Sequence, residues 1–195
     1  MECELLAALE RSLGERARRE LVRPQRAAVL VPIVVGGSSE RLLLTRRTEN
    51  LPTHPGQVAF PGGYIREPGE DAVAAALREA QEEIGLPPER VRVLGLLDDL
   101  PTHTDAVAVT PVVALIEDLP ALRPQTNEVA RIFTIPLAEL GESGRWRSGI
   151  DRTDARERTV HYFDHDGETL WGLSARIVLG LLSLGPGGAP AGLSI

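Results

Sequence analysis

Three neighbouring glutamates are the residues whose type and spacing best suit catalysis. Glu79 lies three residues before Glu82 and four before Glu83. On a helix, these spacings bring all three carboxylates to one face, about 5–6 Å apart. Two unit charges at that separation repel by about 3 kcal/mol at an effective dielectric of about 20, and a bound cation would relieve the repulsion. Because oxygen ligands select hard ions, the cluster predicts a site for Mg²⁺ or Mn²⁺.

A cluster of acids can also be no more than the solvated face of a helix. The neighbouring residues favour a functional site instead. Arg78, four residues before Glu82, can hold that carboxylate in position. Gly62 and Gly63 precede the helix, and their missing side chains let backbone amides approach an anion closely. Glu70 lies just before the helix, where it can join or brace the cluster.

The helix that carries these acids has clear ends. It is predicted over residues 71–84, with Asp71 as its N-cap, an alanine-rich body and Gly85 as its C-terminal stop. Pro87 and Pro88 follow directly and do not continue a helix. The boundaries of this element are therefore well marked.

Residues 62–86 resemble the Nudix box, a motif made of a glycine, a glutamate, and then Arg-Glu, two residues, Glu-Glu, one residue and glycine. Residues 78–86 match the second half of the motif in full. The first half differs, because Gly63 lies one residue further from Glu70 than in the common spacing. The resemblance implies a Nudix hydrolase, which cuts a nucleoside diphosphate linked to another group.

The resemblance also implies roles for single residues. Glu79, Glu82 and Glu83 would bind Mg²⁺ or Mn²⁺, and Arg78 would orient them. The metal would bridge two phosphates and lower the pKa of a bound water, whose proton a carboxylate must accept. Glu79 and Glu82 are candidates for this base within the box, and Glu128 is a candidate outside it. The choice among the three stays open.

Residues 42–63, directly before the box, resemble the additional signature of the coenzyme A diphosphatase branch of the Nudix family. The matching positions are Leu43, Leu44, Thr45, Arg46, Gly56, Phe60, Pro61, Gly62 and Gly63. The extra residue before Glu70 also resembles that branch, whereas Pro52 stands where the branch usually has an arginine. Residues 100–116 and 170–177 are further segments that resemble it.

The resemblance to this branch implies coenzyme A, or a derivative of it, as the substrate, cut to 4′-phosphopantetheine and adenosine 3′,5′-bisphosphate. Such a substrate needs a clamp for its diphosphate and a cation for its 3′-phosphate. Arg46 and Arg47, at a strand end beside the turn of Gly62 and Gly63, suit these tasks, although ordinary surface arginines would look the same. Trp171 is more readily a core residue than a platform for the adenine.

Two other functions share these sequence features. One is a Nudix hydrolase with another substrate, such as ADP-ribose or NADH, which would use the same metal ligands. The other is a Nudix-fold binding or regulatory module that has lost catalysis. The intact set of Glu79, Glu82 and Glu83 argues against such a module, because a module without catalysis has no need of three mutually repelling acids.

The rest of the chain mixes helices and strands without strict alternation, which favours an α+β fold. The Nudix resemblance implies an α/β/α sandwich with a mixed sheet over residues 23–184, preceded by an extra N-terminal helix over residues 1–22 and followed by a flexible tail, residues 185–195. Strands are predicted over residues 27–35, 41–46, 90–97, 107–116, 129–134, 159–164 and 168–171, and the first two form a hairpin. Further helices are predicted over residues 137–140 and 173–182, and a long surface loop over residues 141–158.

Composition argues against several other classes of protein. The apolar run of residues 27–35 is far shorter than the roughly 20 residues of a membrane-spanning helix, so no membrane partner is expected. The formal charge of −7 argues against a nucleic-acid partner bound through a broad basic surface. Cys3, the single cysteine, excludes an internal disulfide and fits a cytoplasmic location. The oligomeric state stays open, a homodimer included.

Overall fold

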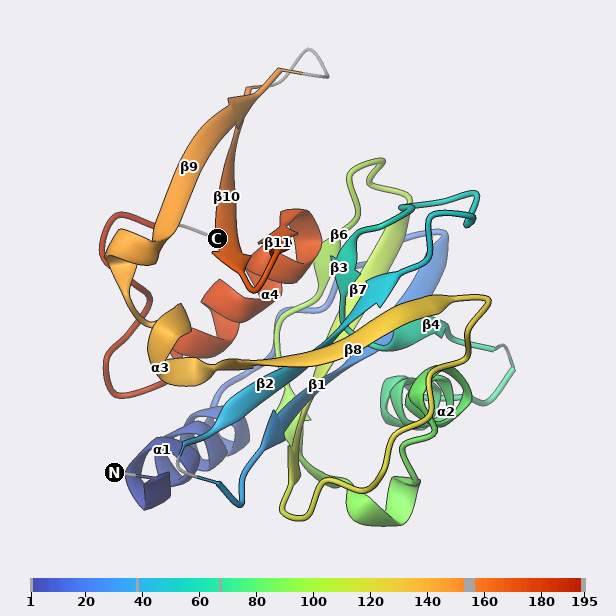
Figure 1. Ribbon diagram of the computed structural model, residues 1–195, viewed down its shortest axis with the longest axis horizontal. Coiled ribbons are helices and arrows are strands. Elements are labelled where there is room, and N and C mark those ends of the chain that lie inside the picture. Colours follow the sequence, from blue (N-terminus) through green and yellow to red (C-terminus); the bar gives the residue numbers. More distant parts are fainter. Residues whose placement is uncertain (1, 38, 67, 153–156, 194–195) are drawn as a thin grey trace.

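The computed structural model describes residues 2–37, 39–66, 68–152 and 157–193, with the side chains of residues 2–5 left out of that description (Figure 1). The helices are α1 (Glu2–Glu15), α2 (Ala72–Ile84), α3 (Leu137–Leu140) and α4 (Gly172–Ser183), together with the 3₁₀ turns η1 (Pro88–Arg90) and η2 (Ser143–Arg145). The strands are β1 (Gln25–Val34), β2 (Arg41–Arg47), β3 (Val58–Ala59), β4 (Gly62–Tyr64), β5 (Arg92–Leu96), β6 (Leu100–Pro101), β7 (Val107–Ile116), β8 (Val129–Pro136), β9 (Trp146–Asp151), β10 (Arg158–His165) and β11 (Glu168–Trp171).

A mixed sheet of eight strands lies at the centre of the molecule. Its order is β3-β2-β1-β7-β5, with β4 added beside β1, β6 beside β7 and β8 beside β2. β1 and β7 run parallel and pair along their whole length, from Gln25 opposite Val107 to Val34 opposite Ile116. β1 and β2 pair antiparallel, which confirms the predicted hairpin.

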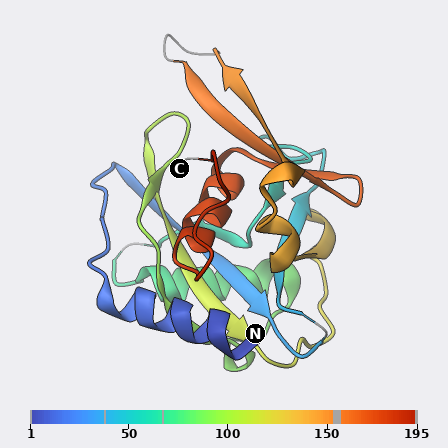
Figure 2. The same ribbon diagram turned by 90° about the vertical axis from the view of Figure 1, so that its left-hand side faces the viewer.

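The central strands are buried on both faces, and alternate side chains enter two different cores. Leu30 of β1 and Leu43 of β2 belong to the core that α2 covers. Ile33 of β1 and Leu44 of β2 belong to the core on the other face, which α1 and α4 cover. Figure 2 shows α1 and α4 on the near side of the sheet and α2 on the far side. The predicted α/β/α sandwich is therefore confirmed.

The N-terminal helix is shorter than the sequence indicates. α1 ends at Glu15, and residues 16–22 form an irregular linker. The carboxylates of Asp98 and Asp99 hold this linker by accepting hydrogen bonds from the backbone amides of Arg19 and Leu21, both at 2.9 Å. In a continuing helix, these amides would donate to the carbonyls four residues earlier. Here they donate to the two carboxylates instead, so the helix does not extend through the linker.

The prediction of a surface loop over residues 141–158 is wrong for its middle part, which forms β9. β9 pairs antiparallel with β10, and β11 completes a second, three-stranded sheet. Trp146 anchors β9, because its ring packs on Phe163 with centroids 5.2 Å apart and its Nε1 donates to the Leu140 carbonyl at 2.9 Å. One face of β9 is solvated, so the segment contains arginines and glycines instead of a continuous apolar pattern. This composition hides the strand from a reading of the sequence. Residues 153–156 lie outside the described residues.

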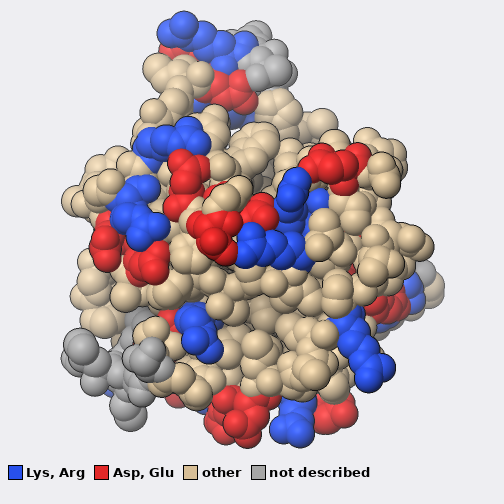
Figure 3. All heavy atoms as spheres, in the orientation of Figure 1, with Lys and Arg blue, Asp and Glu red and all other residues tan. Residues whose placement is uncertain are grey.

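The C-terminal residues return to the domain, where Pro190 is buried and Leu193 packs on the core beside α4. Within the described ranges, no helix is long and apolar enough to cross a membrane. On the face seen in Figure 3, acidic and basic side chains lie side by side. That face has no broad basic area of the kind that binds nucleic acid.

Candidate active site

Helix α2 is built much as the sequence predicts. Asp71 caps its first turn by accepting a hydrogen bond from the Ala74 amide at 2.8 Å, and Gly85 ends it in the left-handed conformation, with φ of 67°. Ala76 and Ala80 are fully buried, so the helix backbone lies close to the sheet. Their small side chains bring the functional residues of α2 close to β4.

Glu83 is the most buried of the three glutamates, with 6% of its surface exposed. Its Oε2 accepts a hydrogen bond from the backbone amide of Gly62 at 3.3 Å. The pKa of Glu83 is raised to about 7, mainly by burial; the Gly62 hydrogen bond and the charge of Arg47 lower it, and the charges of Glu79 and Glu128 raise it. The anion at the Gly62 amide is therefore a carboxylate of the protein itself.

Glu79 lies directly over Gly63. A Cβ atom added to Gly63 would stand 2.6 Å from Cδ of Glu79, a distance that real Cβ atoms essentially never show. The absence of a side chain at position 63 is thus what admits this carboxylate. The two glycines, which the sequence pairs in one role, have different partners in the structure.

Arg78 connects the acids of the site with one another. Its guanidinium donates to Glu70 at 2.7 Å through Nε, to Glu79 at 2.5 Å through Nη1 and to the carbonyl of Tyr64 at 3.1 Å through Nη2. The Arg78 hydrogen bonds, together with one from the Arg66 amide, lower the pKa of Glu70 to about 2. Glu70 thus braces Arg78, which is one of the two roles the sequence leaves open for it.

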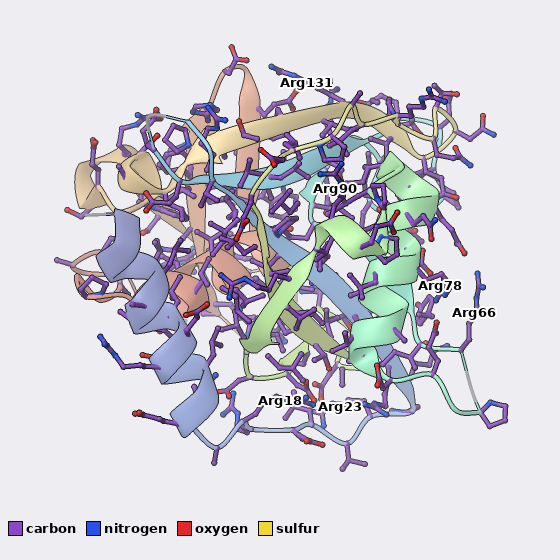
Figure 4. The ribbon with its side chains drawn as sticks, turned by 90° about the horizontal axis from the view of Figure 1, so that it is seen from below. Arg18, Arg23, Arg66, Arg78, Arg90 and Arg131 are labelled. Atoms are coloured by element: carbon purple, nitrogen blue, oxygen red, sulfur yellow. The ribbon has the colours of Figure 1, made fainter. Side chains whose placement is uncertain are left out.

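Glu82 is the most exposed of the three acids, with 49% of its side chain accessible. Nη1 of Arg78 lies 3.4 Å from Glu82, and so does Nη2 of Arg66 (Figure 4). Arg66 is not among the site residues predicted from the sequence. It lies sixteen positions before Glu82, and only the turn between β4 and α2 brings the two together. Its position four residues before Glu70 was the one sequence signal that could have identified it.

The structure separates the two arginines at the end of β2. Arg47 lies near enough to Glu83 for its charge to lower the pKa of that carboxyl, and its buried Nε has no hydrogen-bond partner among the described residues. Arg46 pairs instead with Glu49 at 2.5 Å and approaches Glu168 of β11 at 3.7 Å. A bulge in the β2–β8 pairing falls between the two arginines. Of the predicted pair, only Arg47 is placed beside the acids of α2.

Glu128, the predicted base outside the box, stands at the start of β8. Its carbonyl accepts a hydrogen bond from the Thr48 amide at 2.9 Å, which ties it to the end of β2. Its charge acts on Glu83. The fold therefore brings this residue to the acids of α2, although it follows Glu83 by more than forty positions.

The residues fit a hard divalent cation, although no group of three or more acidic, histidine or cysteine side chains is already assembled as a cage in the described part of the chain. Arg78 draws Glu79 and Glu82 towards itself in this arrangement. The fit follows from Glu83, whose pKa rises because it is buried beside Glu79 and Glu128. A cation at this place would neutralise the shared negative charge.

The comparison with known proteins agrees with this geometry. The model of the NUDIX domain family matches residues 24–156. The chain belongs to the Nudix hydrolase family. Nudix hydrolases act on phosphoric anhydride bonds of nucleoside diphosphate derivatives and generally use divalent metal ions, so the protein is a hydrolase of this class.

Two relatives and one solved structure illustrate the similarity. An uncharacterized Nudix hydrolase NudL of Pectobacterium atrosepticum is 42% identical over 161 residues, 82% of this chain and 82% of that protein. The NudL of Escherichia coli K12 is 39% identical over 170 residues, 85% of each chain. The crystal structure of a MutT/nudix family protein from Enterococcus faecalis has a TM-score of 0.54 at 17% identity and covers 91% of this Nudix chain and 68% of the other. This last similarity concerns the fold alone.

Proposed function

We propose that the protein hydrolyses the diphosphate of coenzyme A or its derivatives, in the presence of Mg²⁺ or Mn²⁺, to 4′-phosphopantetheine and adenosine 3′,5′-bisphosphate. The substrate is proposed from residues 42–63, which resemble the coenzyme A diphosphatase branch. The observation that supports this site is that the charges of Glu79, Glu128 and Arg47 all act on the carboxyl of Glu83. Acids for a metal and an arginine for a phosphate therefore lie near one another.

Each residue of the site has a proposed task. Glu79, Glu82 and Glu83 would hold the metal ion, which when bound polarises the diphosphate and lowers the pKa of water. Arg78 holds Glu79 and Glu82 in position through its own pairing with Glu70. The proton of the attacking water passes to Glu79, to Glu82 or to Glu128, which directly precedes β8. The choice of base stays open among these three.

Arg47 supplies the cation for a phosphate oxygen. In the described part of the chain its buried Nε has no hydrogen-bond partner, so an anion bound there would satisfy this donor. Arg46 already has two carboxylates close to it, Glu49 and Glu168. We therefore assign the phosphate contact to Arg47 rather than to both arginines.

The test of the substrate is mass spectrometry of the products from coenzyme A, with ADP-ribose and NADH as competing substrates under Mg²⁺ and Mn²⁺. We expect 4′-phosphopantetheine and adenosine 3′,5′-bisphosphate, formed with a kcat/KM at least tenfold above that for the other two. Absence of coenzyme A cleavage together with rapid ADP-ribose cleavage would contradict the proposed substrate and leave a Nudix hydrolase of other specificity.

The test of the site compares Glu79→Gln with Glu89→Gln. Removing the charge of Glu79 takes away a metal ligand, and we expect kcat to fall by roughly 10²–10⁴-fold, in the range of lost acid–base or metal contributions. Glu89 is an exposed acid on η1, so its variant should retain wild-type kcat. Equal activity of Glu79→Gln and wild type, with circular dichroism unchanged, would mean that catalysis does not use this site.

A further inference from the structure

Arg176 is a half-buried arginine with no carboxylate partner among the residues that the structure describes. It projects from α4, where its neighbours Ala175 and Ile177 are in the core. Its hydrogen bond runs from Nη1 to the carbonyl of Pro101 in β6, at 3.4 Å. This one long bond leaves most of the five donors of the guanidinium without an acceptor from the described residues.

The charges that shift the pKa of Arg176 have the same sign as its own. Burial lowers the pKa of its guanidinium, and the positive charges of Arg158 on β10 and Arg19 in the linker lower this pKa further. Arg131 and Arg147 show the opposite case, because the hydrogen bonds that they donate to carboxylates raise their pKa values. A repelling group of arginines of this kind is stabilised when an anion binds between them.

A cavity of about 90 Å³ lies beside Arg176, and Arg16 and Arg19 also line its wall, whereas Arg158 is outside this lining and acts on Arg176 through its charge. A water molecule takes up about 30 Å³ in the liquid, so this space admits a small tetrahedral anion. The acid in the wall is Asp98, and its Oδ1 already accepts from Arg16 and from the Arg19 amide. Asp98 therefore does not act as the counter-ion of Arg176.

We propose that Arg176, together with Arg158 and Arg19, forms a binding site for a phosphate monoester. A phosphate monoester is close to a dianion at neutral pH and has three acceptor oxygens, which suits several planar guanidinium groups better than a single carboxylate does. The three arginines come from α4, β10 and the linker after α1. The site is therefore assembled by the tertiary fold, on the side of the sheet away from α2.

The phosphate has two chemical sources that share this recognition. It is either the terminal phosphate of the substrate itself or a separate phosphate compound such as a product. Pro101 of β6 and Tyr64 of β4 are separated by three strand spacings in the plane of the sheet, through β7 and β1. Three spacings correspond to roughly 14 Å between strand backbones. For the first source, the substrate has to run round the sheet edge from α2 to the opposite side, and this source rests on the proposed function.

The first experiment measures phosphate binding without catalysis. Inorganic phosphate and adenosine 3′,5′-bisphosphate are titrated by calorimetry into the protein in EDTA, which keeps divalent metals out of α2. We expect one phosphate per chain, bound at least tenfold more weakly by Arg176→Gln and by Arg158→Gln. Arg90→Gln is the matched control, because Arg90 is an exposed arginine on η1 beside α2 and should not change the affinity.

The second experiment separates the two sources by comparing coenzyme A with 3′-dephospho-coenzyme A. If the substrate supplies the phosphate, Arg176→Gln raises KM for coenzyme A about tenfold and leaves KM for the dephospho form unchanged. If a separate compound supplies it, both KM values stay unchanged while phosphate binding is still lost. Both results support the site, and they identify its ligand.

Two results of the titration would overturn the proposal: no phosphate binding by the wild type, or equal binding by Arg176→Gln and wild type. The titration does not depend on the substrate. If coenzyme A is not cleaved at all, the proposed function fails, and the phosphate site is still decided by the calorimetry.

Discussion

At the scale of single residues, Glu83 differs from its two neighbours in the box because it is buried. Glu79 and Glu82 share the guanidinium of Arg78, whereas within the described residues the carboxylate of Glu83 accepts one hydrogen bond, from the Gly62 amide. A buried carboxylate with few hydrogen bonds to stabilise its negative charge favours its protonated form. The protein therefore holds one acid of the box at a pKa close to neutrality before any cation binds.

This burial predicts a pH dependence of stability in the metal-free protein. Glu83 has a pKa of about 7 in the folded state, against an ordinary value of 4.5, so the folded state binds its proton more tightly than the unfolded state does. The free energy of unfolding should fall as the pH rises from about 4.5 to 7, by roughly 3 kcal/mol at most. Urea unfolding in EDTA at several pH values between 5 and 8 measures this loss.

Glu83→Gln should remove that part of the pH dependence, because the amide does not titrate. Glu89→Gln should retain the wild-type slope, since Glu89 is exposed. Glu70 does not interfere, because its lowered pKa, about 2, places its own effect below pH 4.5. A wild-type slope in Glu83→Gln would show that another group causes the dependence.

At the scale of elements, β4 is a short strand whose two glycines have different functions. A Cβ on Gly62 would stand 2.4 Å from the carbonyl oxygen of Ala28 and 2.6 Å from Cα of Val29, both backbone atoms of β1. A Cβ on Gly63 would meet the mobile end of the Glu79 side chain instead. β4 thus needs one glycine for its pairing with β1 and the other for its contact with α2.

The two alanine variants of β4 should therefore fail in different ways. Gly62→Ala should lower the melting temperature, by a clash with backbone that costs roughly 1–3 kcal/mol. Gly63→Ala should leave the melting temperature within a few degrees of wild type and lower kcat at least tenfold, because it displaces the Glu79 carboxylate. Thermal unfolding and steady-state kinetics on both variants check this. Equal stability loss and equal activity loss in the two would contradict the assignment.

At the scale of the whole molecule, the central sheet separates the active-site helix from the terminal helices. α2 packs on one core, and α1 and α4 pack on the other. The carboxylates of α2 therefore have no direct contact with the core beneath α1. Stability and catalysis should be separable by mutations on the two faces of the sheet.

Leu9→Ala tests this separation. Leu9 has 1% of its surface exposed in the core beneath α1, so its truncation should lower the free energy of unfolding by roughly 2–5 kcal/mol. At a temperature where the variant is folded, kcat should equal that of wild type. Val22→Ala is the control, because Val22 is 93% exposed and its truncation should change neither value. Loss of kcat in a folded Leu9→Ala would show that the two faces are coupled.

The sequence by itself determined the elements whose signals are local. Helix α2 was predictable because its cap, its alanine body and its glycine stop lie within one segment, and the order of acids in the box follows from helical spacing alone. The hairpin of β1 and β2 was predictable for the same reason. β9 was not, because its stability comes from the packing of Trp146 on Phe163 and from pairing with β10, neither of which its own composition reveals.

Only the tertiary structure decided which distant side chains meet. Arg46 and Arg47 are adjacent in the sequence, yet a bulge and two different sets of partners separate their charges. Arg158 and Arg19 are far apart along the chain, yet the charges of both act on Arg176. The physical reason is that local backbone preferences act over a few residues, whereas charge and burial depend on every element packed around a group.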